Sequence, residues 1–239
     1  EVEAALIIHE GRLTYAADSM VTAVTARRDD LGIGMRCEDA VDFYENVFVR
    51  HVTVENLADR PREVCVFFHQ DFYIRGTEVG DTAFFSPEAG ALLHDKDDRY
   101  FLINCATSDH VGVTNYACGQ KDVGGAEGTW RDAEDGVLGG NAIAQGSVDS
   151  TLGVTLSIPA GGSGELYYWI AAGRDFTEVS TINKVVRAKT PAELIRRTRN
   201  YWTLWARKDR RGLDDLPPLL VDRYRQILVL TRSQIEHSG

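Results

Sequence analysis

Residues 46–73 read NVFVRHVTVENLADRPREVCVFFHQDFY, two runs rich in valine, phenylalanine and threonine joined by a short polar segment. Runs of this kind, bounded by turn-forming residues, are typical of β-strands. The joining segment, residues 56–61, contains Asn56, Asp59 and Pro61, which favour tight turns. We therefore predict that residues 56–61 form the hairpin connection between two strands.

The same pattern of short runs extends over most of the chain, from Val2 to Ala172. No long helical segment separates the runs, which favours antiparallel pairing, because parallel strands need crossovers of about a dozen residues or more. We therefore expect a mainly β protein, with a large antiparallel two-sheet supersandwich in residues 1–175. The expected strands are residues 12–16, 21–27, 34–43, 46–55, 63–73, 100–106, 111–117, 152–158 and 165–171.

The sequence pattern changes after Gly173 and predicts helices. Residues 178–188 fit a short helix, and Thr190-Pro191-Ala192-Glu193 supplies an N-cap, a first-turn proline and a capping-box glutamate. We expect two longer C-terminal α-helices, over residues 191–208 and 216–239. Their expected apolar stripes are Leu194, Thr198, Tyr201, Trp202 and Trp205 in the first, and Leu220, Tyr224, Ile227, Leu228 and Ile235 in the second.

Composition indicates a soluble folded protein. The chain has 239 residues, 44% of them hydrophobic, and its net charge of −10 argues against nucleic acid as a partner. No run approaches the ~18 apolar residues of a membrane span, and Glu1-Val2-Glu3 lacks the basic start of a signal peptide. We therefore expect a cytoplasmic protein with no membrane partner. Buried free thiols are expected at Cys37, Cys65, Cys105 and Cys118.

Charge is divided unevenly along the chain. Residues 187–232 contain 12 Lys+Arg and 5 Asp+Glu, a balance of +7 that leaves −17 for the rest. A basic segment of this kind can bind an anionic surface, but we expect its arginines to be solvated or paired with the acidic sandwich. Two helices are too few to bury their own apolar faces, so they should pack on the sandwich or on another domain.

Metal and cofactor motifs are weak. His69 and Asp71 share a strand but lack metal-ligand spacing, and residues 95–98 lack the later glycine and glutamate of a calcium loop. The glycine clusters at 124–128 and 161–164 do not lie at a strand-to-helix turn, as phosphate binding requires. We therefore expect no metal and no cofactor.

Residues 128–136, GTWRDAEDG, form the densest group of functional residue types. Trp130 offers a ring face for a sugar, while Arg131, Asp132 and Asp135 offer charged groups for hydroxyls. Neighbouring carboxylates are also the residue types of a general acid and base. The alternative is a polar loop whose tryptophan fills the sandwich.

The chain resembles the amino-terminal part of prokaryotic family 15 glycoside hydrolases, the glucoamylase and glucodextranase group. The resemblance covers nearly the whole chain and depends on the order and spacing of many short motifs. These are residues 130–136, Leu138, Asn141, 143–150, 38–43, Arg50, 71–74, 79–83, 167–170, Gly173, Tyr201, Trp202, Trp205, Tyr224, Leu228, Arg232, Ser233, Ile235 and Gly239.

The resemblance implies a β-supersandwich joined by linker helices to an (α/α)6 barrel, which carries two glutamates that hydrolyse α-glucosidic bonds with inversion. Residues 176–215 would be the linker and residues 216–239 the first helix of a truncated barrel, so that no catalytic residue lies in this chain. The first strands would then be incomplete, because the given sequence would begin in the middle of a strand at Glu1. Trp130, Arg131, Asp132 and Asp135 would form a substrate-proximal loop. The partners would be the missing catalytic barrel and, through the full-length enzyme, an α-glucan or maltooligosaccharide.

Two other classes of protein stay open at this point. One is a non-catalytic carbohydrate-binding or regulatory module that has kept the sandwich. The other is a sandwich-plus-barrel disaccharide phosphorylase, which phosphate-dependent turnover would reveal.

Overall fold

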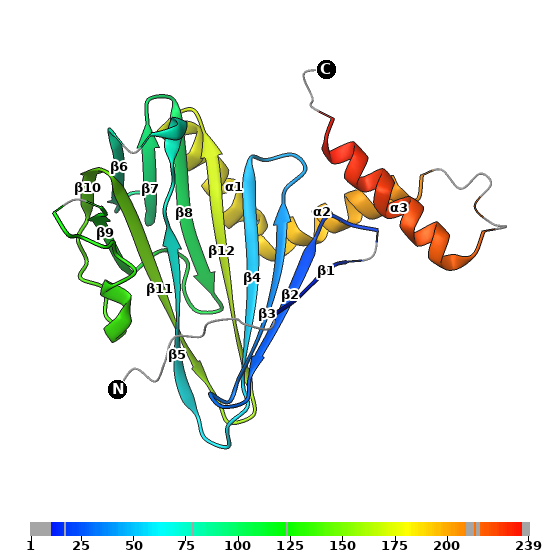
Figure 1. Cartoon of the computed structure of the whole chain (residues 1–239), viewed down its shortest axis with the longest axis horizontal. Helices are drawn as coiled ribbons and strands as arrows, with labels where there is room; N and C mark the ends of the chain where they lie inside the picture. Colours follow the sequence, from blue (N-terminus) through cyan, green and yellow to red (C-terminus); the bar gives the residue numbers. More distant parts are fainter. Residues whose placement is uncertain are drawn as a thin grey trace.

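The computed structural model describes residues 11–16, 18–77, 79–122, 124–208, 213 and 216–235. Within these residues the chain forms strands followed by helices (Figure 1). The strands are β1 Gly11–Tyr15, β2 Thr22–Arg28, β3 Ile33–Val41, β4 Val47–Asn56, β5 Arg62–Gln70, β6 Asp81–Ser86, β7 Ala91–Lys96, β8 Arg99–Thr107, β9 Asn115–Gln120, β10 Ile143–Gly146, β11 Val148–Ile158 and β12 Ser163–Gly173. The helices are α1 Phe176–Lys189, α2 Pro191–Ala206 and α3 Pro218–Ser233.

The strands form two antiparallel sheets. The larger sheet has nine strands in the order β1-β2-β3-β4-β12-β8-β7-β6-β10, and the smaller has three in the order β5-β11-β9. One hydrophobic cluster lies between the two sheets, and a second lies between the larger sheet and the helices α1 and α2. Figure 1 shows these helices behind the larger sheet, with α3 projecting to one side. The expected mainly β, two-sheet antiparallel sandwich is confirmed.

Trp169 on β12 fixes α1 to the larger sheet. Its side chain is fully buried, and its indole nitrogen donates to Asn183 Oδ1 on α1 over 3.0 Å. Asn104 on β8 donates to the same oxygen over 3.2 Å. Burying these polar groups is tolerated because they satisfy one another, and the result is a defined position for the first helix on the sheet.

The predicted hairpin at residues 56–61 is wrong, because β4 and β5 lie in different sheets. Asn56 instead holds a crossing between the sheets: its side-chain amide donates to the carbonyls of Arg60, Ile158 and Pro159 over 2.8, 3.3 and 3.1 Å. Turn-forming residues indicate where a chain reverses, but they do not determine which strand it pairs with next.

The strands β6, β7 and β10 were not among the expected ones. They are short, with six, six and four residues, so each offers little alternating pattern. The strand expected at residues 111–117 also begins later, at Asn115, because Val111 forms only an isolated bridge with Ala106.

The described residues form three helices after the sandwich. The segment expected at 178–188 is the full-length helix α1, and α2 matches the helix expected at 191–208. As expected, Thr190 caps α2 by accepting from the Glu193 backbone N–H over 3.3 Å. The last predicted helix, residues 216–239, corresponds to α3, which ends at Ser233; residues 236–239 lie outside the described part, as do residues 1–10 with the expected entry at Glu1.

Candidate functional site

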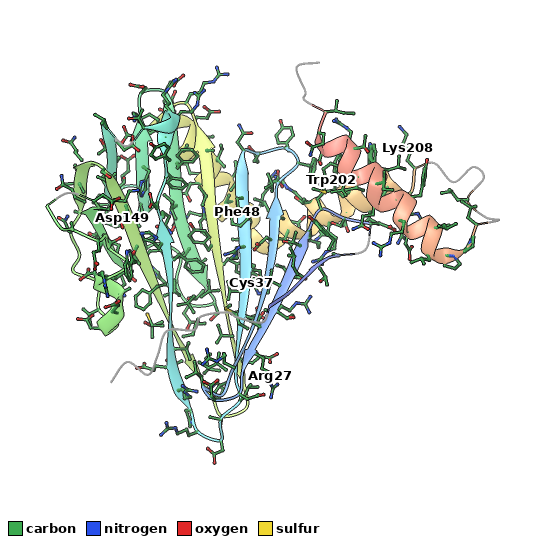
Figure 2. All side chains as sticks on the ribbon, in the orientation of Figure 1. Arg27, Cys37, Phe48, Asp149, Trp202 and Lys208 are labelled. Carbon is green, nitrogen blue, oxygen red and sulfur yellow. The ribbon has the colours of Figure 1, made fainter. Side chains whose placement is uncertain are left out.

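The candidate loop around Trp130 is anchored to the smaller sheet by a buried carboxylate. Asp149 lies on β11 and is fully buried (Figure 2). Its Oδ2 accepts the Thr129 backbone N–H over 2.8 Å and lies 2.8 Å from His69 Nε2 on β5. Gly128, with a φ of 109°, permits this approach, since a Cβ there would lie 2.3 Å from Asp149 Oδ2.

Trp130 lies at the surface of this loop with 43% of its area exposed. Its indole N–H donates to the Glu127 carbonyl over 2.7 Å, and the Arg131 guanidinium lies 4.5 Å from the ring centroid. Arg131 in turn pairs with Glu127 and with Glu134. The alternative that this tryptophan fills the sandwich is therefore wrong.

Asp132 and Asp135 serve the loop backbone. They lie in a 3-10 turn, Asp132–Asp135, where Asp132 accepts the Gly139 N–H over 2.6 Å and Asp135 accepts the Val137 N–H over 2.9 Å. The structure thus places Trp130, Arg131, Asp132 and Asp135 on one short loop. The loop offers a partly exposed indole beside a guanidinium, while its carboxylates are engaged in fixing the turn.

A second polar network lies nearby, inside the sandwich. His94 on β7 is 1% exposed, and its Nε2 lies 2.7 Å from Ser150 Oγ. Ser150 donates to Gln70 Oε1 over 3.0 Å, and Gln70 donates to the Tyr168 hydroxyl over 3.1 Å. Burial lowers the pKa of His94 to about 4, so this imidazole is neutral near neutral pH. No sequence spacing indicated this network, whose members come from four strands.

A buried ion pair joins α2 to the sandwich. The carboxylate of Asp42 accepts from Arg197 Nε and Nη2 over 2.7 and 2.6 Å, and from Thr198 Oγ1 over 3.2 Å. It also accepts the backbone N–H groups of Tyr44 and Glu45 over 3.0 and 2.8 Å. One acidic side chain therefore fastens the helix to the connection between β3 and β4.

Further ion pairs continue along the helices. Arg199 contacts Glu38 over 3.1 Å, while Arg207 and Arg225 contact Asp18 over 2.7 and 3.7 Å. The expectation that arginines of the basic segment pair with the acidic sandwich is confirmed for these residues.

The helix α3 presents apolar side chains to solvent. Leu219, Leu220 and Ile227 are 67%, 53% and 61% exposed, whereas Val229 is buried. Of the expected stripe, Leu220, Tyr224, Ile227 and Ile235 are exposed and Leu228 is half-buried, so the sandwich and α2 leave most of it uncovered. The side of α3 that contains Val229 is the one packed within the chain.

The described residues contain neither a group of metal ligands nor a membrane-spanning helix. Among them, no group of three or more histidine, cysteine, aspartate or glutamate side chains could hold a metal ion. His69 and Asp71 have separate partners, since Asp71 pairs with Lys121 over 2.5 Å. Residues 95–98 contain the turn between β7 and β8. Among all the described residues, no helix is long and apolar enough to cross a membrane.

The cysteines are unpaired. Cys37, Cys105 and Cys118 are buried, and Cys65 is half-buried. Burial raises the pKa of Cys105 and Cys118 to about 12, so these two thiols are protonated and inert at neutral pH.

The fold defines a class: an antiparallel sandwich of nine and three strands with helices on the outer face of its larger sheet. The same fold occurs in a bacterial glucoamylase solved in complex with acarbose, with a TM-score of 0.63 and 11% sequence identity. That match covers 83% of this chain and 28% of the glucoamylase chain. The sandwich fold implied by the family resemblance is therefore confirmed.

Two other solved structures show lower similarity. One, described as a kojibiose phosphorylase from the human microbiome, has a TM-score of 0.47 and 9% identity over 77% of this chain and 23% of its own. The other is an inverting family GH92 mannosidase from Bacteroides thetaiotaomicron, with a TM-score of 0.41 and 12% sequence identity. That match covers 78% of this chain and 22% of the mannosidase chain. No protein-family model matches the sequence, and no curated protein matches it either.

Replacing Asp149 with alanine is expected to release the Trp130 loop. The Thr129 N–H and His69 would lose their buried acceptor, which costs about 1–3 kcal/mol of stability. Hydrogen exchange at the Thr129 amide should accelerate relative to amides of α1. Asp109→Ala is the control, because within the described part of the chain this carboxylate accepts only from the neighbouring exposed Ser108. Unchanged exchange at Thr129 in Asp149→Ala would show that other contacts hold the loop.

Proposed function

We propose that the chain is the non-catalytic amino-terminal region of an inverting α-glucosidic glycoside hydrolase of the glucoamylase type. Residues 1–175 form its sandwich domain, residues 176–215 its linker helices, and residues 216–239 the first helix of an (α/α)6 catalytic barrel. The chain supports the barrel and contributes a loop to the mouth of its active site. Its substrate is an α-glucan or maltooligosaccharide, and the enzyme acts in the cytoplasm.

The observation that carries this proposal is the exposed apolar side of α3. Leu219, Leu220 and Ile227 are exposed on a helix that follows a sandwich with the fold found in a glucoamylase. Exposed apolar side chains grouped on one helix mark a surface that another domain covers. A catalytic barrel supplies such a cover, and burial of each of these side chains would contribute about 1.5–3 kcal/mol.

The Trp130 loop supports the second part of the proposal. An indole with 43% exposure beside Arg131 can stack on a sugar ring while the guanidinium binds a hydroxyl. Asp132 and Asp135 fix the turn that presents both groups. We assign these four residues to a substrate-proximal loop, with the chemistry left to the barrel.

Full-length protein, expressed from the gene that encodes this chain, tests the proposal. It should hydrolyse maltooligosaccharides without phosphate and release β-glucose first, which NMR detects through the anomeric proton. Trp130→Ala should raise KM or lower kcat for these substrates. Phosphate-dependent turnover, or glycan binding without turnover, would overturn the hydrolase in favour of a phosphorylase or a binding module.

The proposed contact between α3 and the barrel can be tested separately in the full-length protein, through its free energy of unfolding. The double variant Leu220→Ser and Ile227→Ser should lower the full-length protein's free energy of unfolding by about 3–6 kcal/mol, because two buried apolar side chains are lost. In the 239-residue chain, where both side chains are exposed, the same change should have little effect. Asp222→Ser, a change at an exposed position on the side of the helix away from Leu220 and Ile227, is the control. Equal effects in both proteins would show that no domain covers α3.

A further inference from the structure

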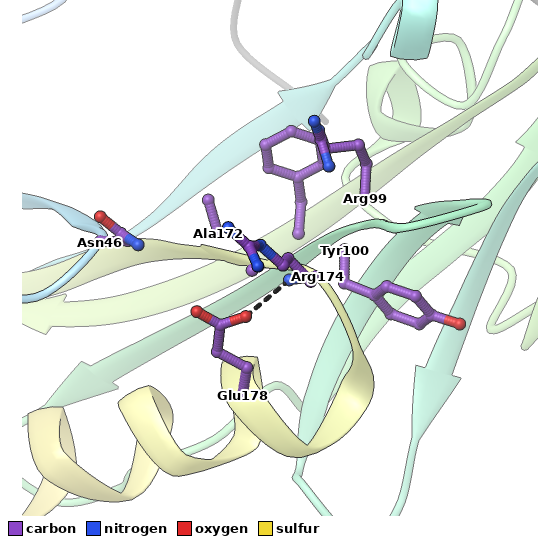
Figure 3. A pocket seen from close by; sticks show the side chains of 8 residues that line it. Asn46, Arg99, Tyr100, Ala172, Arg174 and Glu178 are labelled. Carbon is purple, nitrogen blue, oxygen red and sulfur yellow. Dashed lines mark hydrogen bonds between the residues drawn. The ribbon is translucent and has the colours of Figure 1, made fainter. Parts of the chain in front are cut away.

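A hollow of about 330 Å³ lies where the larger sheet meets the start of α1 (Figure 3). Asn46, Arg99, Arg174 and Glu178 contribute to its lining, together with the backbone at the end of β12. Gly173 forms part of this floor: a Cβ there would lie 2.9 Å from Val179 Cγ1 and 3.1 Å from Glu178 Cγ. The absence of a side chain at Gly173 therefore lets the first turn of α1 approach the strand.

Two arginines line this hollow. The ladder between β12 and β8 ends with Gly173 opposite Tyr100, and the residues next to this last pair, Arg174 and Arg99, both contribute to the lining. Two like charges at one hollow repel each other. Arg99 is partly compensated by Asp98, at 3.0 Å. For the Arg174 guanidinium, no hydrogen bond or ion pair occurs within the described residues, so an anion between the two arginines would remove the repulsion.

The remaining polar groups indicate what else the anion carries. Glu178 uses Oε2 to accept the Arg174 backbone N–H over 2.8 Å, and its other oxygen can accept from a hydroxyl. The Asn46 side chain adds a donor and an acceptor. A volume of about 330 Å³ lies within the usual range of small-molecule sites, ~300–1,000 Å³. A bare inorganic ion would leave Glu178 and Asn46 unused.

We propose that this hollow binds a small hydroxylated anion of the sugar-phosphate class. The two guanidinium groups of Arg99 and Arg174 bind the phosphate, and Glu178 and Asn46 bind the hydroxyls. Arginine suits phosphate because its planar fork donates two parallel hydrogen bonds to two oxygens. The hollow includes no residue of α3 or of the Trp130 loop, so this binding is independent of the proposed hydrolase function.

NMR titration of the 239-residue chain at low ionic strength tests the site, with glucose 6-phosphate, inorganic phosphate and glucose as probes. Glucose 6-phosphate should give saturable shifts at the amides of Gly173 and Arg174 and bind more tightly than either other probe. Arg174→Ala and Arg99→Ala should each weaken this binding about tenfold or more, as expected for a charge-assisted hydrogen bond.

Arg27→Ala provides a control with the same change in charge, because Arg27 lies on β2 toward the opposite end of the sandwich (Figure 2). It should leave the affinity unchanged. Three outcomes would overturn the site: no saturable shift, equal weakening by Arg27→Ala, or inorganic phosphate binding as tightly as glucose 6-phosphate. All substituted arginines are exposed or at the rim, so the variants should retain the fold, which their amide spectra verify.

Discussion

Replacing Asp42 with alanine should lower the free energy of unfolding by about 3–5 kcal/mol. The Asp42 carboxylate is almost fully buried and accepts from Arg197, from Thr198 and from two backbone N–H groups. Its removal leaves the largely buried Arg197 guanidinium without a counterion and two N–H groups without an acceptor. Breaking one side of such a pair costs far more than the intact pair contributes, because the remaining charge stays desolvated.

Urea unfolding followed by circular dichroism measures this effect. Tryptophan fluorescence should also change, because Trp202 and Trp205 lie on the helix that Asp42 fastens. The double variant Asp42→Ala and Arg197→Met should lose less stability than Asp42→Ala alone, since it leaves no unpaired charge. Arg196→Ala, which removes an exposed pair with Glu193 on the same helix, should have no resolvable effect. Similar losses in Asp42→Ala and Arg196→Ala would contradict a special role for the buried pair.

The architecture could be predicted from the sequence because it depends on local patterns. Alternating apolar residues in β4, β8, β11 and β12 indicate strands, and Thr190-Pro191-Ala192-Glu193 indicates the start of α2. Pairing could not be predicted in the same way. Asn56 illustrates the reason: its amide binds carbonyls at Ile158 and Pro159, about a hundred positions away in the sequence. Which sheet receives β5 is decided by such distant contacts.

The candidate site shows the same division. The loop could be predicted because tryptophan, arginine and aspartates cluster within six positions, from Trp130 to Asp135. Its anchor, Asp149, lies within a stretch that carries the family resemblance, yet no motif or spacing assigns it a role. That role arises only when β11 pairs with β5 and brings His69 alongside.

The spacing of apolar residues in α3 predicts a buried stripe, but most of this stripe is exposed in the structure. Leu220 and Ile227 follow helical spacing and are exposed, because the described part of the chain covers only the side near Val229. Helical spacing of apolar residues indicates that one face of a helix is covered by other residues. It does not indicate whether those residues belong to the same chain. This difference is what supports a second domain in the proposed function.

Stability should fall as pH decreases from about 6.5 to about 4, through the buried His94. Its folded pKa is lowered to about 4, chiefly by burial, against 6.5 for a free side chain. Between these values the unfolded chain binds a proton that the folded chain excludes, so the free energy of unfolding rises with pH and is lost on acidification. The gap between 6.5 and about 4 corresponds to about 3 kcal/mol.

His94→Gln isolates this contribution. Because Ser150 donates to Gln70, its oxygen is left to accept from His94 Nε2, so the histidine must carry its proton on that nitrogen. A glutamine amide can donate in the same way but does not titrate. Urea unfolding at pH 7.0 and at pH 4.5 should therefore show a smaller acid loss in His94→Gln than in the unsubstituted protein. His110→Gln, a change at an exposed position in the loop between β8 and β9, is the control. Parallel pH profiles for the unsubstituted protein and His94→Gln would mean that the folded protein accommodates the imidazolium, and the buried network would then have to open to solvent in acid.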